Sequence, residues 1–174
     1  MKKFIYFFFA FSIIFSSCTK EEGCTDPLAT NFNVDAENDD GSCIFGVAGG
    51  EWITQSIVAS GSITASMMGI PIFDSIINFT ETNPDSLNPY KLVMINNGSY
   101  MSYNNYNVLI ETGTWAATSS HLTIFAPDGT IIFDINSLNK DQASFSTNIN
   151  ESENDDGFTI ESNLTYTLNT NRTW

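Results

Sequence analysis

The three cysteines, Cys18, Cys24 and Cys43, are the side chains of this chain best suited to do chemistry. A thiol can take a lipid, form a disulfide, attack a substrate or bind a metal ion. The sequence holds a single His, so we expect no metal site built from His and Cys. What each cysteine does therefore depends on the segment around it.

The segment before Cys18 has the layout of a secretory signal peptide. Residues 2–3 are basic, residues 4–15 are apolar, and two small serines follow at 16–17. The apolar run is shorter than the roughly 20 residues that a permanent membrane-spanning helix needs. An ordinary membrane anchor or a buried helix is the alternative, and we favour a cleaved signal peptide over residues 1–17.

Ser16-Ser17-Cys18 resembles the lipobox of bacterial lipoproteins, although Phe15 stands where Leu is usual. The resemblance implies that Cys18 starts the mature chain and carries acyl chains, which hold a soluble domain at a membrane. Lys20-Glu21-Glu22 resembles the signal that sends lipoproteins of some gliding-type Gram-negative bacteria to the cell surface. We therefore expect a lipidated tether at residues 18–23. It would belong to an outer-membrane lipoprotein that faces the cell exterior and meets the membrane only through its lipid.

Cys24 and Cys43 remain as a pair once Cys18 carries lipid, and in an exported chain a disulfide persists. The loop between them has few large apolar side chains and cannot build a core, so it needs a covalent link. Loop closure would contribute roughly 3 kcal/mol to stability. Residues 23–43 also resemble a Cys-Thr-Asp-Pro…Asp-Asp-Gly-Ser-Cys module of secreted and surface proteins of the same bacteria. We expect a small disulfide-stapled acidic module over residues 24–45.

The acidic side chains of this module raise the question of a calcium site. Hard oxygen ligands gather before Gly41, at Asp35, Glu37, Asp39 and Asp40. Their spacing does not fit an EF-hand in either register. We prefer a solvated acidic turn and keep Ca²⁺ as the minority hypothesis, with no other cofactor expected.

The charge of the chain excludes some partners. The whole sequence carries a formal net charge of −14, and loss of residues 1–17 would remove two lysines and no acid. Phosphate binding needs Lys and Arg. A protein this acidic therefore repels nucleic acid and anionic lipid. We expect no nucleic-acid partner.

From about residue 50 the sequence alternates with a period of two and predicts an all-β domain over residues 50–174. Turn signals such as "NNG" at 96–98 and "PDG" at 127–129 separate the runs. The spacing predicts an antiparallel meander that forms a barrel or a sandwich. The expected strands lie at 51–59, 62–68, 72–81, 90–96, 99–105, 108–117, 121–126, 130–136, 142–150 and 157–169.

Gly50-Glu51-Trp52 at the start of this domain resembles the lipocalin signature, in which the Trp closes one end of an eight-stranded barrel. Ile135, Leu138 and Phe145 fit an "I-x-x-L" turn of lipocalin-like domains in small bacterial surface lipoproteins. The resemblance implies a lipocalin-like barrel of about eight strands. Lipocalins also place an Arg from the last strand over the Trp. Arg172 is the only candidate for that contact here, and it lies past the alternating run, so the alternation does not itself place it over the Trp.

The lipocalin resemblance implies a binding protein for one small apolar or amphipathic ligand in the barrel mouth. The residues that we expect to line that mouth are Trp52, Phe79, Tyr100, Tyr103, Phe125 and Phe133, with Tyr106 and Phe145 as further candidates. The alternative is an adhesion or interaction module that meets a glycan or a protein through the Tyr/Asn-rich segment 99–107, because rings and amides contact sugars without burying charge. We expect a monomer in either case.

Catalysis finds little support in the sequence, and we expect no enzyme. His121 follows two serines but has no evident nucleophile or partner, and no cysteine is left for nucleophilic work. Glu111 and Asp134 could in principle form a glycosidase pair, although nothing in the sequence brings them together.

Overall fold

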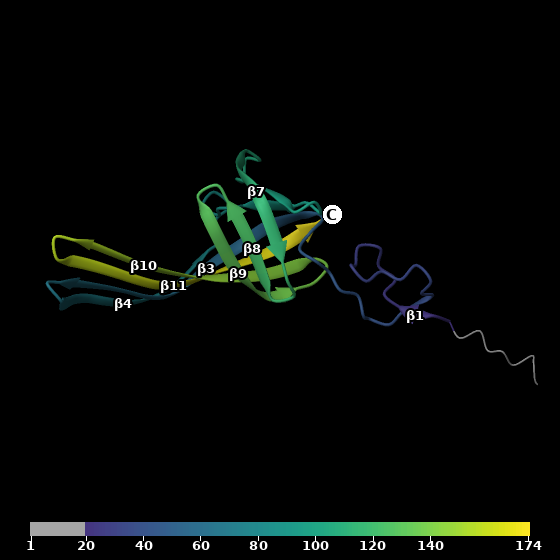
Figure 1. The fold of residues 1–174 in the computed structure, drawn as a ribbon, viewed down its shortest axis with the longest axis horizontal. Helices are drawn as coiled ribbons and strands as arrows, with labels where there is room; N and C mark the ends of the chain where they lie inside the picture. The colour runs from purple at the N-terminus through teal and green to yellow at the C-terminus, as the bar shows by residue number, and fades with distance from the viewer. Residues whose placement is uncertain (1–19) are drawn as a thin grey trace, which may run out of the picture. The chain divides into compact units, whose positions relative to one another are not determined.

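The computed structural model describes residues 20–174, so the predicted signal peptide and the lipidated Cys18 lie outside the described residues. The described chain divides into two compact units between Ile44 and Phe45, the first described from residue 20 onward and the second ending at Trp174. Figure 1 shows their ribbons. Residues 20–174 form strands and turns throughout, and no helix among them is long and apolar enough to cross a membrane.

The first unit is held together by the predicted disulfide. Cys24 and Cys43 are joined, with their Cα atoms 4.8 Å apart, and Cys24 is almost wholly buried. Its regular structure is one short parallel pair, β1 (Glu22–Gly23) with β2 (Asn38–Asp39). Side-chain hydrogen bonds replace a core, since Asn31 binds the backbone of both Ser42 and Ile44.

The second unit is the predicted antiparallel meander, and eight of its strands close into a barrel. A ninth strand, β4 (Ile70–Glu81), pairs only with the outer half of the first barrel strand and leaves its far edge open. The barrel strands are β3 (Glu51–Met67), β5 (Lys91–Met94), β6 (Ser99–Tyr103), β7 (Leu109–Ala117), β8 (His121–Ala126), β9 (Gly129–Leu138), β10 (Gln142–Asp155) and β11 (Phe158–Thr173).

The pairing of β3 with β11 closes the barrel and then continues beyond it. Along Ile57–Met67, β3 pairs with β11 on one side and with β4 on the other. The outer half of β10 pairs only with β11, because its contact with β9 ends at Ser146. The result is a four-stranded sheet in the order β4-β3-β11-β10, which we call the arm and which projects from the barrel in Figure 1.

Two-residue turns end both hairpins of the arm. Met68 and Gly69 join β3 to β4, and Asp156 and Gly157 join β10 to β11, all with positive φ as type I′ turns require. The Met68 amide donates a hydrogen bond to the Gly157 carbonyl over 2.7 Å. The two hairpins are therefore linked up to their tips.

The predicted break in the first strand near residues 60–61 is wrong, because β3 runs straight through Gly61. A Cβ built on Gly61 would lie 2.0 Å from the carbonyl oxygen of Asn163, and its φ is +148°. The glycine that suggested a turn instead lets two backbones approach closely within one sheet.

Trp52 lies at the closed end of the barrel, where it anchors the core. It is 1% exposed, its Nε1 donates to the Val47 carbonyl over 2.8 Å, and its ring meets Phe145 edge-on. Other members of this buried cluster are Met94, Tyr100, Leu122, Ile124 and Ala143.

Arg172 covers Trp52, a contact that the sequence left open. Because β11 extends to Thr173, the guanidinium carbon of Arg172 lies 3.8 Å from the Trp52 ring centroid and 4.5 Å from that of Trp174. The guanidinium also donates to the Gly46 carbonyl. Burial lowers the pKa of Arg172 to about 10, against the opposing effect of the Asp141 charge, so the side chain stays charged at neutral pH. Cation–π stacking on two rings holds this end closed.

Replacing Gly61 tests the close approach of β3 and β11. Gly61→Ala should lower the free energy of unfolding by about 1–3 kcal/mol, because the Asn163 backbone must shift and the φ disfavours a Cβ. Urea unfolding followed by circular dichroism measures the change. Gly129→Ala is the control, since nothing lies within 4 Å of its built Cβ. Equal stability of the two variants would contradict the account.

Replacing Arg172 tests the stack at the closed end. Arg172→Lys keeps the charge but loses the flat guanidinium, so we expect a loss of about 2 kcal/mol or more together with a weaker near-ultraviolet tryptophan signal. Asn171→Ala changes the neighbouring exposed residue and should shift stability by less than about 0.5 kcal/mol. An unchanged tryptophan signal in Arg172→Lys would refute the stack.

Candidate functional site

The open end of the barrel contains a cavity of about 250 Å³. Its wall comes from strands β5 to β9 and from β11, with the Asn88–Pro89 segment beside it. Most of the wall is apolar, and four polar side chains share it. The apolar members are Leu92, Ile110, Ile124, Ile131, Phe133 and Leu168 together with Pro89, and the polar ones are Asn88, Tyr100, Ser102 and Glu111.

The strand register places these side chains inside. Residues directly opposite each other in antiparallel strands share a face, and Ile124 pairs with Ile131 while Ser102 pairs with Glu111. Tyr100 pairs with Gly113, where a built Cβ would lie 2.7 Å from the Tyr100 ring and 2.3 Å from the Phe125 carbonyl. Gly113 thus leaves the space that the Tyr100 ring occupies.

Tyr100 and Glu111 form the polar centre of the cavity. Tyr100 is 2% exposed, and its hydroxyl donates a hydrogen bond to Glu111 Oε1. Burial raises the pKa of the Tyr100 hydroxyl well above its usual range, and the Glu111 carboxylate raises it further. The hydroxyl therefore stays protonated and works as a fixed donor, while the half-buried carboxylate presents acceptor oxygens to the cavity.

Outside the cavity, a larger groove of about 730 Å³ lies where the arm leaves the barrel. Ile131, Phe133 and Leu168 border both hollows, so the cavity opens into the groove. Ile57, Ile149 and Tyr166 of the arm line the groove's other side. An apolar path therefore leads from Glu111 to the arm.

Of the six residues predicted to line the ligand site, the structure brings Tyr100 and Phe133 into the cavity. The other four lie elsewhere. Trp52 is buried under Arg172, Phe79 lies half-exposed on the arm, Tyr103 lies beneath the Lys91 ammonium, and Phe125 is 44% exposed. Of the further candidates, Phe145 packs on Trp52 and Tyr106 is 73% exposed.

Sequence reasoning missed Glu111 as a cavity residue, together with the aliphatic side chains around it. It considered Glu111 only with Asp134, as a glycosidase pair that nothing in the sequence brings together, and the two face opposite sides of the barrel wall. Asp134 pairs with His121, whose neighbour Leu122 faces the core, so the acid lies outside. Only the strand register, which the alternating pattern leaves open by one residue, could have revealed this.

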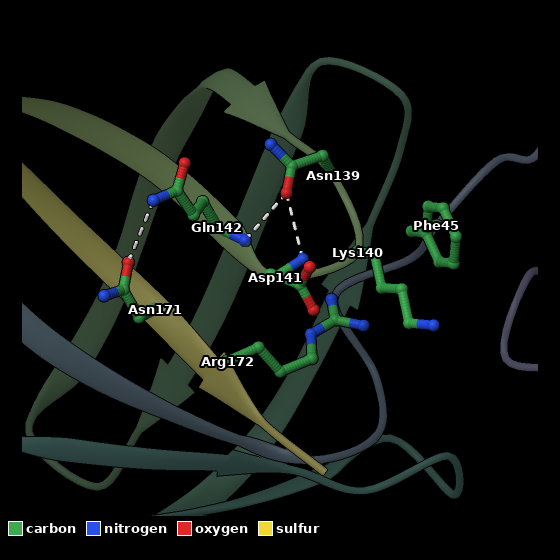
Figure 2. A pocket seen from close by; sticks show the side chains of 7 residues that line it. All are labelled: Phe45, Asn139, Lys140, Asp141, Gln142, Asn171 and Arg172. Carbon is green, nitrogen blue, oxygen red and sulfur yellow. Dashed lines mark hydrogen bonds between the residues drawn. The ribbon is translucent and has the colours of Figure 1, made fainter.

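A third hollow, of about 660 Å³, lies near the closed end around the turn between β9 and β10 (Figure 2). Its polar side chains bind one another. Asn139 Oδ1 accepts from the amides of Asp141 and Gln142, and the Gln142 side chain donates to Asn171. The Arg172 amide donates to the Asp141 carbonyl. The bonds of Asn139 shape the turn and the backbone bond from Arg172 holds it against β11, so we regard this hollow as structural.

Ser120, His121 and Asp134 form a hydrogen-bonded chain that the sequence did not predict. Ser120 Oγ lies 2.7 Å from His121 Nδ1, and His121 Nε2 lies 3.2 Å from Asp134 Oδ1. A catalytic triad has the two ring nitrogens the other way round, with serine at Nε2. About half of the His121 and Asp134 side-chain surface is exposed, where water screens their charges. The chain therefore lacks the buried, oriented geometry of a triad.

Several acidic side chains of the first unit have structural partners. Asp39 and Asp40 accept hydrogen bonds from the amides of Gly41 and Ser42, and the bonds with Ser42 lower the pKa of Asp40. Glu37 lies 3.9 Å from Lys20. Within residues 20–174, no three His, Cys, Asp or Glu side chains gather as a metal site would need. Calcium at Asp35, Glu37, Asp39 and Asp40 stays a hypothesis.

The pH dependence of stability tests the hydrogen bond between Tyr100 and Glu111. Tyr100→Phe should cost about 1–3 kcal/mol of unfolding free energy near neutral pH, since it removes the hydroxyl bound to a half-buried carboxylate. The raised pKa of Tyr100 means that wild-type stability falls as pH rises above about 10, the ordinary value. The gap between the two proteins should therefore narrow at high pH in urea unfolding. Tyr106→Phe, at an exposed tyrosine, should show no such narrowing.

In comparisons with known proteins, no family model matches the chain, no curated protein matches its sequence and no solved structure matches its fold.

Proposed function

We propose that this protein is a lipid-anchored, outward-facing outer-membrane lipoprotein whose barrel binds a small apolar or amphipathic ligand without transforming it. One observation carries the binding proposal. The cavity at the open end is apolar on most of its wall, contains a fixed polar pair, and opens into a groove. This is the composition of ligand pockets in general, which are mostly apolar with a few placed polar groups.

The size of the two hollows constrains the ligand. Pockets for drug-sized molecules run from about 300 to 1,000 Å³, so the cavity of about 250 Å³ holds only part of one. The ligand would place one end in the cavity and the remainder in the groove. An elongated molecule fits that path better than a compact one.

The polar pair constrains the ligand's chemistry. Glu111 already accepts from Tyr100 and has a second carboxylate oxygen, which would accept from a hydroxyl, amide or ammonium group. A carboxylate or phosphate at the same place would be repelled. We therefore favour a ligand with an apolar chain and a neutral or cationic hydrogen-bond donor.

An adhesion module is the second candidate, and two observations support it. Trp52, Tyr100 and Phe145 already fill much of the barrel. Tyr106 is 73% exposed beside Asn105, and both side chains bind Asp85, which orders a Tyr/Asn surface. Such a surface suits contact with a glycan or a protein.

Native mass spectrometry of the protein purified from its own host, without denaturant, separates the two proposals. A discrete added mass that is lost on mild denaturation is expected if the barrel carries a ligand. An unliganded mass that takes up no apolar compound offered in excess would contradict ligand binding and favour adhesion.

A blocked cavity is the second test of ligand binding. Ile131→Trp should weaken the binding of the neutral fluorescent dye phenylnaphthylamine about tenfold or more, because the indole would fill the shared wall of cavity and groove. Phe125→Trp adds the same side chain on the neighbouring strand, away from both hollows, and should leave binding unchanged. Equal effects of the two variants would overturn the assignment of the site.

A further inference from the structure

The two faces of the arm differ sharply in chemistry. Opposite residues share a face, so the pairs Leu164–Ile149, Ile160–Ala65 and Ala65–Phe73 fix one side as apolar. We call this side the arm apolar face, and its larger members are Phe73, Phe79, Ile149, Phe158, Ile160 and Leu164. The other side carries mainly Ser, Thr and Asn, among them Ser62, Thr64, Asn150, Ser152, Asn163 and Thr165. Ile76 breaks the pattern on the polar side.

The arm apolar face is open to solvent. Phe73 and Phe79 are 52% and 53% exposed, Met67 is 52% exposed, and Ile149 is 40% exposed. The face continues the inner surface of the barrel, because Leu168 and Ile57 lead from the cavity directly onto it. A sheet with one apolar and one polar face is half of a two-layer sandwich, and none of the sheets formed by residues 20–174 supplies the second layer.

The area of the face matches what a stable dimer needs. The four strands span roughly 19 Å at about 4.8 Å per strand, and Ile57–Met67 span roughly 36 Å at about 3.3 Å per residue. One face therefore measures roughly 700 Å². Two such faces packed together would bury about 1,400 Å², within the usual range of specific protein interfaces.

The charges on the arm limit what can cover it. The strand segments of the arm carry no Lys or Arg, while Glu81, Glu151, Glu153 and Asp155 lie on the apolar side along its two outer strands. Anionic lipid and nucleic acid would be repelled by this rim. An apolar centre with a charged rim is the usual anatomy of a protein interface.

We propose that two copies of this chain associate through their arms, with one arm apolar face packed on the other. The sequence led us to expect a monomer, since it does not show that this face is uncovered. The barrel wall rises on the same side as the arm apolar face, so the two barrels must lie at opposite ends. A two-fold axis that crosses the arms near their middle satisfies this condition and makes the interface isologous.

Crosslinking in intact cells of the host tests the dimer on the full chain. Ser162 lies near the middle of the arm on the apolar side, paired with Ile63, whereas Ser62 lies at the same level on the polar side, paired with Asn163. Both serines are half-buried. With a short bis-maleimide, Ser162→Cys should give a covalent dimer of twice the chain mass, because packed sheets lie about 10 Å apart. Ser62→Cys should remain a monomer.

A second substitution in the Ser162→Cys background distinguishes specific packing of the two faces from chance encounters between crowded copies. Ile160→Asp should lower the dimer yield about tenfold or more, because each copy would bury an unpaired carboxylate. Asn163→Asp, on the polar side, should leave the yield unchanged. A crosslink to a protein of another mass, a monomer from Ser162→Cys, or equal yields from both serine variants would each overturn the proposal.

The salt dependence of the crosslinking yield gives an independent test of the dimer. The acidic rims of two copies repel each other, so added salt should increase the Ser162→Cys dimer yield. A Ser162→Cys dimer yield that falls with salt would mean that charge attraction holds the two copies together, and it would contradict packing of the two apolar faces.

Discussion

The pairing of β3 with β11 is the interaction on which the rest of the second unit depends. It joins the first and last strands of the barrel along their whole length, from Trp52 opposite Arg172 to Met67 opposite Phe158. At one end it brings the guanidinium onto the indole. In its middle it supplies Leu168 to the cavity, and beyond the barrel it forms the centre of the arm. Contacts so distant in sequence carry a large loop-closure entropy, which the length of the pairing must offset.

This continuity gives one face of the sheet three environments. Where the barrel closes, the inward face is packed by Trp52, Phe145 and their neighbours. Farther along, the same face borders the cavity with Tyr100 and Glu111. On the arm it meets solvent as an apolar surface. The packed core, the cavity and the exposed apolar face thus follow from a single alternation of side chains, and they differ in how far the barrel covers them.

The sequence predicted the class of this fold well, because period-two alternation and turn residues act locally. It placed the hairpin turns, the all-β domain and the disulfide between Cys24 and Cys43. It did not predict that β3 continues through Gly61, since a glycine in a strand reads alike as a turn or as a close approach. The expected last strand ended at residue 169, too early for Arg172 to reach Trp52. The final residues of β11 are Asn, Thr and Arg, so no apolar alternation marks them as strand.

The cavity could not be assembled from the sequence, because which aromatic side chains face inward depends on register. Phe125 and Phe133 lie on neighbouring strands, yet one is exposed and the other lines the cavity. The aliphatic residues at Ile124 and Ile131 gave no signal that set them apart from any core position. Glu111 was visible only as one of many acids.

The open outer edges of the arm have a consequence for the size of any assembly. Along β4 and the outer half of β10, backbone amides and carbonyls lack a strand neighbour, which is the arrangement from which fibres grow. Acidic side chains stand on both strands, at Asp74 and Glu81 on one and at Glu151, Glu153 and Asp155 on the other. Any further sheet added edge to edge would bring like charges together without neutralising them. The edge carboxylates therefore oppose edge-to-edge growth of the sheet into a filament.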